Sequence, residues 1–309
     1  MARRAAVIVI VLLLFGLTTA CTPSSPPSEP VATPAPPPPP PPAEKSEAAP
    51  AATTSRLDNL HLLVAPILPG KMEAYREFVD KSRDPEMYAK YAESRANAGI
   101  TRETVWLQKN PDGSALSIVA LETPDVAASM KKFAEQANNF DKQFVPWLKE
   151  VHGMDPANPR QPEVLAALLY AGAGSGTQQK SHAFVMPIPA DKVESATKWV
   201  AEQESNDPAK FKEFREKLGI AVDKAVLFKT PDGAALVVYH ESPDPETVLA
   251  RVLASEDPVV VEFVNSVKEM SGIDMTKMKD MPPNEMVVNY PKVKTGSADE
   301  AVPPGPPTP

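Results

Sequence analysis

Two spacings of apolar residues alternate along most of this chain. Short apolar runs predict strands, and His61–Pro66 and His182–Pro187 are runs of this kind that proline ends. Longer stretches carry apolar residues every three or four positions, which predicts helices. Met72, Tyr75 and Phe78, for example, fall on one face of a helix.

The whole pattern occurs twice. His61–Lys71 corresponds to His182–Lys192, and NPDGSALSIVALETPD (Asn110–Asp125) corresponds to TPDGAALVVYHESPD (Thr230–Asp244). Each second segment begins about 120 residues after the first, and so long a period indicates two copies of a domain rather than a short-period solenoid.

Each copy predicts a strand, a helix, a hairpin, a second helix and a last strand. The first copy is expected to have strands 61–66, 104–109, 116–121 and 164–170, a helix from 72 that restarts at 84 and ends near 99, and a helix over 126–151. The second copy is expected to have strands 182–187, 224–229, 236–240 and 286–290, a helix from 193 that restarts at 207 and ends near 219, and a helix over 247–270 that restarts at 257. The run EVLAALLYA, which contains strand 164–170, also fits a helix. Asp112-Gly113 and Asp232-Gly233 supply the positive φ angles of a tight hairpin turn.

The order βαββαβ is that of the ferredoxin-like split βαβ unit. Its sheet has helices on one face only, yet Leu62 and Leu63 show that both faces of the first strand are apolar. A second copy is therefore expected to cover the open face. The sequence predicts an α+β fold of two tandem ferredoxin-like repeats that form an intrachain dimeric α/β-barrel, a monomer with an internal pseudo-dimer.

This arrangement resembles the dimeric α/β-barrel superfamily, with both halves fused in one chain. Each repeat also resembles a bacterial family of uncharacterised single-copy proteins with the same pattern, here Val105–Gln108, Pro111–Gly113 and Glu122. The resemblance implies the fold, whereas the superfamily includes monooxygenases, haem-binding enzymes and proteins with no known reaction.

The N-terminus is typical of an exported protein. Arg3 and Arg4 precede the apolar run AAVIVIVLLLFGL, which predicts a signal peptide over residues 1–20 and is short for a membrane span. The following LTTA and Cys21, the only cysteine, resemble the lipobox of bacterial lipoproteins, although Thr18 stands where that motif has leucine. The resemblance implies that Cys21 carries acyl chains such as palmitate, which anchor the protein to a membrane of the cell envelope, outside the cytoplasm. Ordinary signal-peptide cleavage after Ala20 is the alternative.

The composition sets the remaining boundaries. We expect a lipid anchor and proline-rich disordered linker over 21–56, the first repeat over 57–172, a linker over 173–180, the second repeat over 181–295 and a disordered tail over 296–309.

Charge and motifs exclude several classes of function. The net charge is −8 and no basic stripe is present, so nucleic acid is not an expected partner. The repeats contain no cysteine, which excludes a cysteine nucleophile. They contain no HExxH, CxxC, glycine-rich phosphate loop or nucleophile elbow, and the four histidines occur in unrelated contexts. We therefore expect neither a metal nor a cofactor.

Polar residues at matching positions are candidates for a ligand pocket between each sheet and its helices. The candidates are His61 and His182 at strand starts, Arg95 and Arg215 late in helices, Glu122 and Glu241 at strand ends, and His240 in the second copy only. A histidine at a strand start commonly binds a backbone group instead. The two arginines could pair with the two glutamates or hold an anionic ligand.

Two functions follow from these expectations. The first is a membrane-anchored module that binds a small apolar or anionic ligand or a partner protein, because no catalytic set is complete. The alternative is an enzyme that resembles the cofactor-independent monooxygenases or haem-binding enzymes of the superfamily, with a histidine as acid–base group or axial ligand.

Overall fold

The computed structural model of the protein describes residues 56–158, 162–172, 179–278 and 283–291. The expected signal peptide, Cys21, all of the proline-rich linker except residue 56 and the whole C-terminal tail lie outside the described residues. Within the described residues, no helix has the length and apolar character needed to cross a membrane.

The first repeat contains the predicted order of elements. Its elements are β1 (Leu60–Ile67), α2 (Met72–Lys81), α3 (Pro85–Asn97), β2 (Arg102–Lys109), β3 (Ala115–Glu122), α4 (Val126–Ala134), α5 (Asp141–His152) and β4 (Val164–Ala171). The ambiguous run EVLAALLYA forms strand β4. The expected helix over 126–151 is interrupted, because the Asn138 side chain accepts a hydrogen bond from Asp141 N at 2.8 Å and Gln136 has a φ of 47°.

The second repeat follows the same order. Its elements are β5 (Lys180–Pro189), η1 (Ala190–Lys192), α6 (Val193–Asn206), α7 (Pro208–Lys217), β6 (Val222–Thr230), β7 (Gly233–Ser242), η2 (Pro245–Thr247), α8 (Val248–Ala254), α9 (Pro258–Ser271), η3 (Met275–Met278) and β8 (Glu285–Tyr290). The predicted restarts are present, since Asp207 and Asp257 cap α7 and α9 and proline follows each in the first turn. Gly233 in the hairpin is required by space, because a Cβ there would lie 2.2 Å from Ile188 O.

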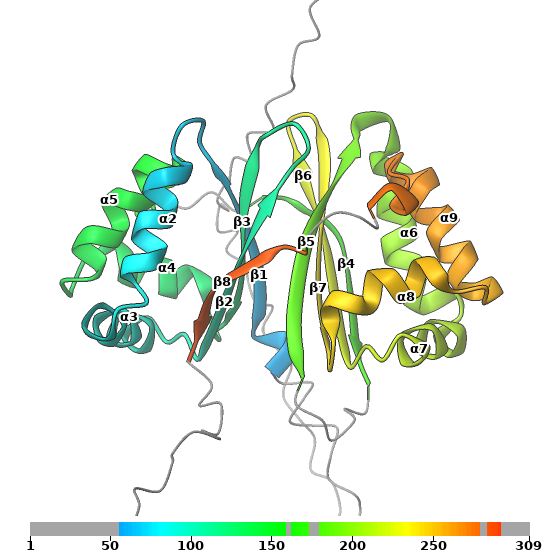
Figure 1. Cartoon of the computed structure of the whole chain (residues 1–309), viewed down its shortest axis with the longest axis horizontal. Coiled ribbons are helices and arrows are strands. Elements are labelled where there is room, and N and C mark those ends of the chain that lie inside the picture. Colours follow the sequence, from blue (N-terminus) through cyan, green and yellow to red (C-terminus); the bar gives the residue numbers. More distant parts are fainter. Residues whose placement is uncertain (1–55, 159–161, 173–178, 279–282, 292–309) are drawn as a thin grey trace, which may run out of the picture.

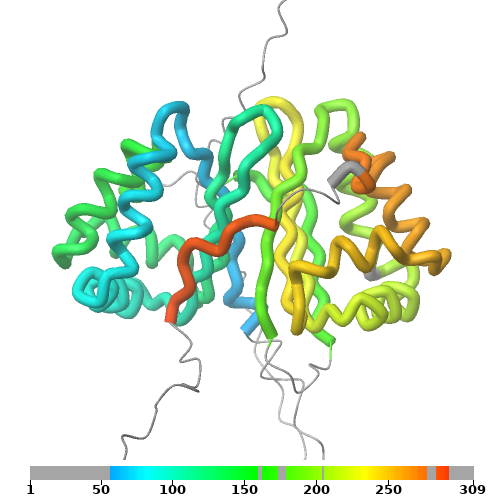
Figure 2. The backbone as a smooth tube through the Cα atoms, viewed as in Figure 1, coloured from blue at the N-terminus to red at the C-terminus, as the bar shows by residue number. Residues whose placement is uncertain are grey.

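The repeats exchange their last strands. Sheet A has the order β1-β3-β2-β8 and sheet B the order β4-β6-β7-β5, and all pairs within them are antiparallel. Strand β4 of the first repeat therefore completes the sheet of the second, and β8 of the second completes the sheet of the first. Figure 2 shows the segment that contains β8 crossing to the opposite half.

The two sheets pack face to face, and their helices cover the outer faces (Figure 1). The core between the sheets contains residues of both repeats, among them Leu62, Trp106 and Ile118 from sheet A and Val185 and Val237 from sheet B. Separate cores lie between each sheet and its helices. The chain is therefore an α+β protein of two tandem ferredoxin-like repeats in a dimeric α/β-barrel arrangement, which confirms the predicted fold class. The exchange of the last strands was not predicted.

Candidate functional site

A cavity of about 100 Å³ lies in the first repeat between sheet A and helices α2, α3, α4 and α5. Most of the side chains around it are apolar, and many are aromatic: Leu63, Tyr75, Phe78, Tyr91, Met130, Phe133, Phe140, Phe144, Trp147 and Val288. Val288 belongs to β8, so the second repeat contributes to the wall of this cavity.

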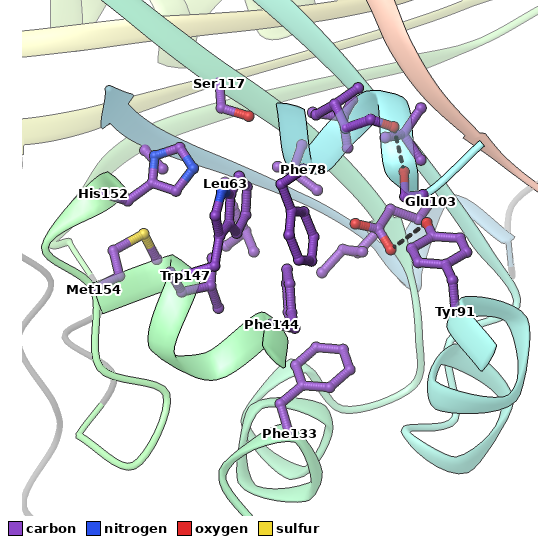
Figure 3. A pocket seen from close by; sticks show the side chains of 18 of the residues that line it. Leu63, Phe78, Tyr91, Glu103, Ser117, Phe133, Phe144, Trp147, His152 and Met154 are labelled. Carbon is purple, nitrogen blue, oxygen red and sulfur yellow. Dashed lines mark hydrogen bonds between the residues drawn. The ribbon is translucent and has the colours of Figure 1, made fainter. Parts of the chain in front are cut away.

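Stacked rings form one wall of the cavity. The Phe78 and Trp147 rings are 4.4 Å apart and nearly parallel, and Phe144 lies 5.8 Å from Trp147. The Trp147 indole also donates a hydrogen bond to Ala74 O at 3.3 Å, which fixes its orientation. Figure 3 shows Phe78, Phe144, Phe133 and Trp147 arranged around the space. Such a wall favours a flat apolar ligand.

A buried ion pair closes one end of the cavity. Arg95 Nε donates to Glu103 Oε2, and its Nη2 lies 3.3 Å from Glu103 Oε1. Tyr91 also donates to Glu103 Oε2, at 2.8 Å (Figure 3). The guanidinium carbon lies 4.3 to 5.3 Å from the ring centres of Tyr91, Phe133, Phe140 and Phe144. Burial, with the negative charge of Glu103, raises the pKa of Tyr91 well above its ordinary value, so this phenol stays a hydrogen-bond donor.

The other end contains His152 and Tyr75. His152 Nδ1 lies 2.8 Å from Pro66 O, and because a carbonyl only accepts, Nδ1 carries the proton. Burial lowers the pKa of His152 to about 4, so the imidazole is neutral at pH 7. Burial raises the pKa of Tyr75 to about 12, and its hydroxyl lies 3.3 Å from Ser117 Oγ. This end therefore carries no net charge.

The second repeat has an equivalent ion pair of arginine and carboxylate, but with different side chains around it. Arg215 donates to Asp223 Oδ2 from Nε and Nη2, both at 3.0 Å, and lies over the Phe211 ring. The matching β1 and β5 segments place Phe184 where the first repeat has Leu63. Phenylalanine is the larger side chain, and around Arg215 the structure places a groove between helices α6, α7 and α9.

The structure brings together two of the predicted histidines, neither at the cavity. His182 and His240 face each other across paired strands, with ring centres 5.5 Å apart. Burial, with His240 nearby, lowers the pKa of His182 to about 4, and its Nε2 has no hydrogen-bond partner within the described part of the chain. His61 occupies the matching place in the first repeat and lies 3.0 Å from Thr123 O. This contact is the backbone alternative that the sequence left open for a histidine at a strand start.

The pairing of the arginines with Glu122 and Glu241, one of the two alternatives that the sequence left open, does not occur. These glutamates lie on the faces of β3 and β7 that meet between the sheets, whereas Arg95 and Arg215 lie on the helix side. Glu122 and Glu241 instead converge on Arg56 and Arg102, with nitrogen–oxygen distances of 2.9 to 3.6 Å. They couple the two repeats and do not line the cavity.

Sequence reasoning missed the acidic partners, Glu103 and Asp223. Both follow the glycine at the end of the preceding helix by four residues, so their recurrence was a usable signal. It missed the aromatic wall as a binding feature because ring residues at helical spacing are typical of any core.

The residues around this cavity do not fit a haem group. The cavity is smaller than the roughly 300 Å³ at the low end of ligand pockets, and His152, the one histidine among its lining residues, is packed edge-on against Tyr75 and Trp147. No group of three potential metal ligands occurs within the described residues.

Several solved structures resemble this chain, at low similarity. No protein-family model and no curated protein matches the sequence. A candidate monooxygenase of Fusobacterium nucleatum subsp. nucleatum superposes with a TM-score of 0.42 and 10% identity, over 74% of this chain and 92% of that chain. An anthrone oxidase-like protein gives 0.38 and 13%, over 69% and 86%. A candidate monooxygenase of Lactobacillus acidophilus gives 0.40 and 7%, over 75% and 95%. At these values the likeness says nothing about activity. The fold and the site define a two-repeat α/β-barrel protein with an aromatic cavity in its first repeat.

Proposed function

We propose that this protein is a lipid-anchored module of the bacterial cell envelope whose first repeat binds a small, neutral, single-ring ligand that donates one hydrogen bond. The observation that carries the proposal is the aromatic cavity that ends at the carboxylate of Glu103. Phenol is the simplest molecule with these properties.

The size of the cavity supports a single ring. An engineered apolar cavity of about 150 Å³ holds benzene. The present cavity of about 100 Å³ is of the same order. A fused polycyclic ligand would need several walls to move.

The charge balance supports a neutral ligand over an anionic one. Glu103 already neutralises Arg95, and Arg95 Nη1 lies 3.2 Å from Ser94 Oγ. Glu103 Oε2 accepts from two donors, whereas Oε1 has one long contact at 3.3 Å. A carboxylate offers about four acceptor positions, so Oε1 has capacity for a ligand hydroxyl.

Binding is favoured over catalysis because the donors around the cavity are already used within the protein. Tyr91 and Arg95 donate to Glu103, and His152 donates to the backbone, so an acceptor position on Glu103 Oε1 is what remains for a ligand. Turnover of the bound ring, as in a cofactor-independent monooxygenase, is the alternative that the binding experiment also detects.

The membrane anchor rests on the N-terminal sequence. The basic start, the apolar run and Cys21 support export and lipidation. We expect Cys21→Ser to move the protein from the membrane fraction to the soluble fraction of the cell envelope and to abolish incorporation of labelled palmitate. Labelled palmitate that persists in Cys21→Ser would contradict the proposal.

The ligand is tested by calorimetric titration of the protein without residues 1–20. We expect phenol to bind more tightly than toluene, which lacks the donor, and benzoate not to bind. Leu63→Phe, which installs the residue of the second repeat, should fill the cavity and reduce phenol affinity at least tenfold while the melting temperature is kept.

Val164→Phe, which adds a ring at a position that is 55% exposed and does not line the cavity, is the control and should leave phenol affinity unchanged. Equal phenol affinity in Leu63→Phe and in the parent protein would refute the site. Mass spectrometry of the titrated phenol decides the alternative, because an oxidised product would establish an enzyme.

A further inference from the structure

A second site lies on the second repeat, in a groove of about 190 Å³ between helices α6, α7 and α9. We propose that this groove binds a small organic cation, an ammonium group attached to an apolar body about the size of one ring. The groove is separate from the cavity of the first repeat, so the proposal does not depend on the function proposed above.

The floor of the groove is aromatic. Trp199 and Phe263 have ring centres 5.7 Å apart, and Phe214 lies 4.6 Å from Phe263. In the first repeat, Phe78 and Trp147 stack at 4.4 Å in the corresponding place. The matching segments KEVHGMD and KEMSGID align Trp147 with Ser266, so the second repeat has a small side chain where the first has a stacked ring. The groove lies beside Trp199 for this reason.

The rim of the groove is acidic. Glu202, Asp207 and Glu262 line it, whereas the matching segments of the first repeat place Lys81 opposite Glu202 and Gln143 opposite Glu262. Two negative charges therefore appear in the second repeat where the first has a positive and a neutral side chain.

The basic residues near the groove neutralise only part of this charge. Arg215 is held by Asp223 at 3.0 Å, and Lys210 is held by Glu262 at 2.6 Å. Lys198 lies 3.9 Å from Glu202, but its side chain is 72% exposed and well solvated. Glu202 also accepts a hydrogen bond from Asn206 at 3.2 Å, and Asp207 accepts one from Lys210 N at 2.9 Å. The three rim carboxylates exceed the two lysines by one negative charge, which favours a cation over an anion.

An aromatic floor below an acidic rim is the combination that recognises ammonium groups. The face of an indole attracts a cation by its quadrupole, and a carboxylate adds a direct charge interaction. The volume limits the ligand to a small molecule, and the apolar floor requires that the ammonium group carry an apolar body.

Isothermal titration of the protein without residues 1–20 tests the proposal, with benzyltrimethylammonium as the cation and benzyl alcohol as the neutral probe. We expect the cation to bind more tightly than the alcohol, with an affinity that falls as salt is added. Glu202→Gln should weaken cation binding about two- to fivefold, and Trp199→Leu should weaken it about two- to thirtyfold.

Glu77→Gln, an exposed carboxylate of the first repeat, is the matched control and should leave cation affinity unchanged. Glu202 is on the rim, so Glu202→Gln tests the site even if Trp199→Leu fails to fold. Leu63→Phe should bind the cation normally, which separates this site from the cavity. Equal affinity for both probes, or unchanged cation affinity in Glu202→Gln, would overturn the proposal.

Discussion

At the scale of single residues, the two repeats differ most along one row of paired side chains. In sheet A the row is Glu103, Leu121 and His61, and in sheet B it is Asp223, His240 and His182. Sheet B has His240 where sheet A has Leu121, so two histidines, His182 and His240, lie side by side in sheet B. Burial lowers the pKa of both His182 and His240, so neither is charged at pH 7. The two histidines are therefore a neutral buried pair beside the Arg215–Asp223 ion pair.

Buried neutral histidines make stability depend on pH. An imidazole in an unfolded chain has a pKa of about 6.5, whereas burial lowers the pKa of His152 to about 4. Between these values the unfolded chain binds the proton and the folded chain does not, so the free energy of unfolding falls as pH is lowered from 6.5 toward 4. For His152 the loss is about 2 kcal/mol at pH 5.

We predict that His152→Asn removes this part of the pH dependence. Asparagine can still donate a hydrogen bond to Pro66 O but does not titrate. Urea unfolding at pH 7 and pH 5 measures the effect, and the difference between the two pH values should be smaller in the variant by about 2 kcal/mol. Carboxylates contribute equally to both proteins and cancel in the comparison. An identical pH dependence would show that His152 is protonated in the folded protein.

At the scale of elements, the apolar pattern predicts the type and order of the strands but not their partners. Alternating apolar residues identify β4 and β8 as strands, and the same pattern fits either sheet, because both sheets have an open edge beside an equivalent strand. Pairing of β8 with β2 and of β4 with β6 depends on the path of the connections, which residue spacing does not record.

The sequence likewise predicts some residues of the site but not their partners. Recurrence identified Arg95 and Arg215 as candidates for a ligand pocket or for buried ion pairs. It did not identify Glu103 as the partner of Arg95, since the face on which a strand residue lies follows from register. The cavity depends on the sizes of individual side chains, such as Leu63 against Phe184 and Trp147 against Ser266, and no pattern of polar positions shows such differences.

At the scale of the whole molecule, the exchanged strands make each repeat depend on the other. Tyr290 of β8 is paired with Glu103 and packs edge-on against Tyr91, at 5.6 Å, in the first repeat. Tyr170 of β4 is paired with Asp223 and packs against Phe211, at 5.8 Å, in the second. Each half thus supplies a tyrosine beside the ion pair of the other half.

Polar contacts between the sheets add to this dependence. Arg102 of sheet A contacts Glu122 of its own sheet at 3.4 Å and Glu241 of sheet B at 3.2 Å. Lys224 of sheet B donates to the backbone oxygen of Leu60, at the start of β1. These contacts, together with the apolar core between the sheets, favour a single cooperative unfolding unit.

We predict that the first repeat alone, residues 57–172, folds only as a homodimer. In this fragment β2 lacks its neighbour β8, and β4 has no sheet to join. In a homodimer, β4 of one copy can take the place of β8 beside β2 of the other copy, with Tyr170 in the place of Tyr290. The same association covers the apolar face of sheet A, which sheet B covers in the whole chain. Light scattering with circular dichroism should show a folded dimer whose melting temperature rises with protein concentration.

A fragment of residues 57–158, which ends before β4, is the matched control and should not form a stable fold, because its sheet has neither a fourth strand nor one to exchange. A folded monomer of 57–172 would show that a repeat can complete its own sheet, and the exchange would then be a consequence of fusing two repeats rather than a requirement of each.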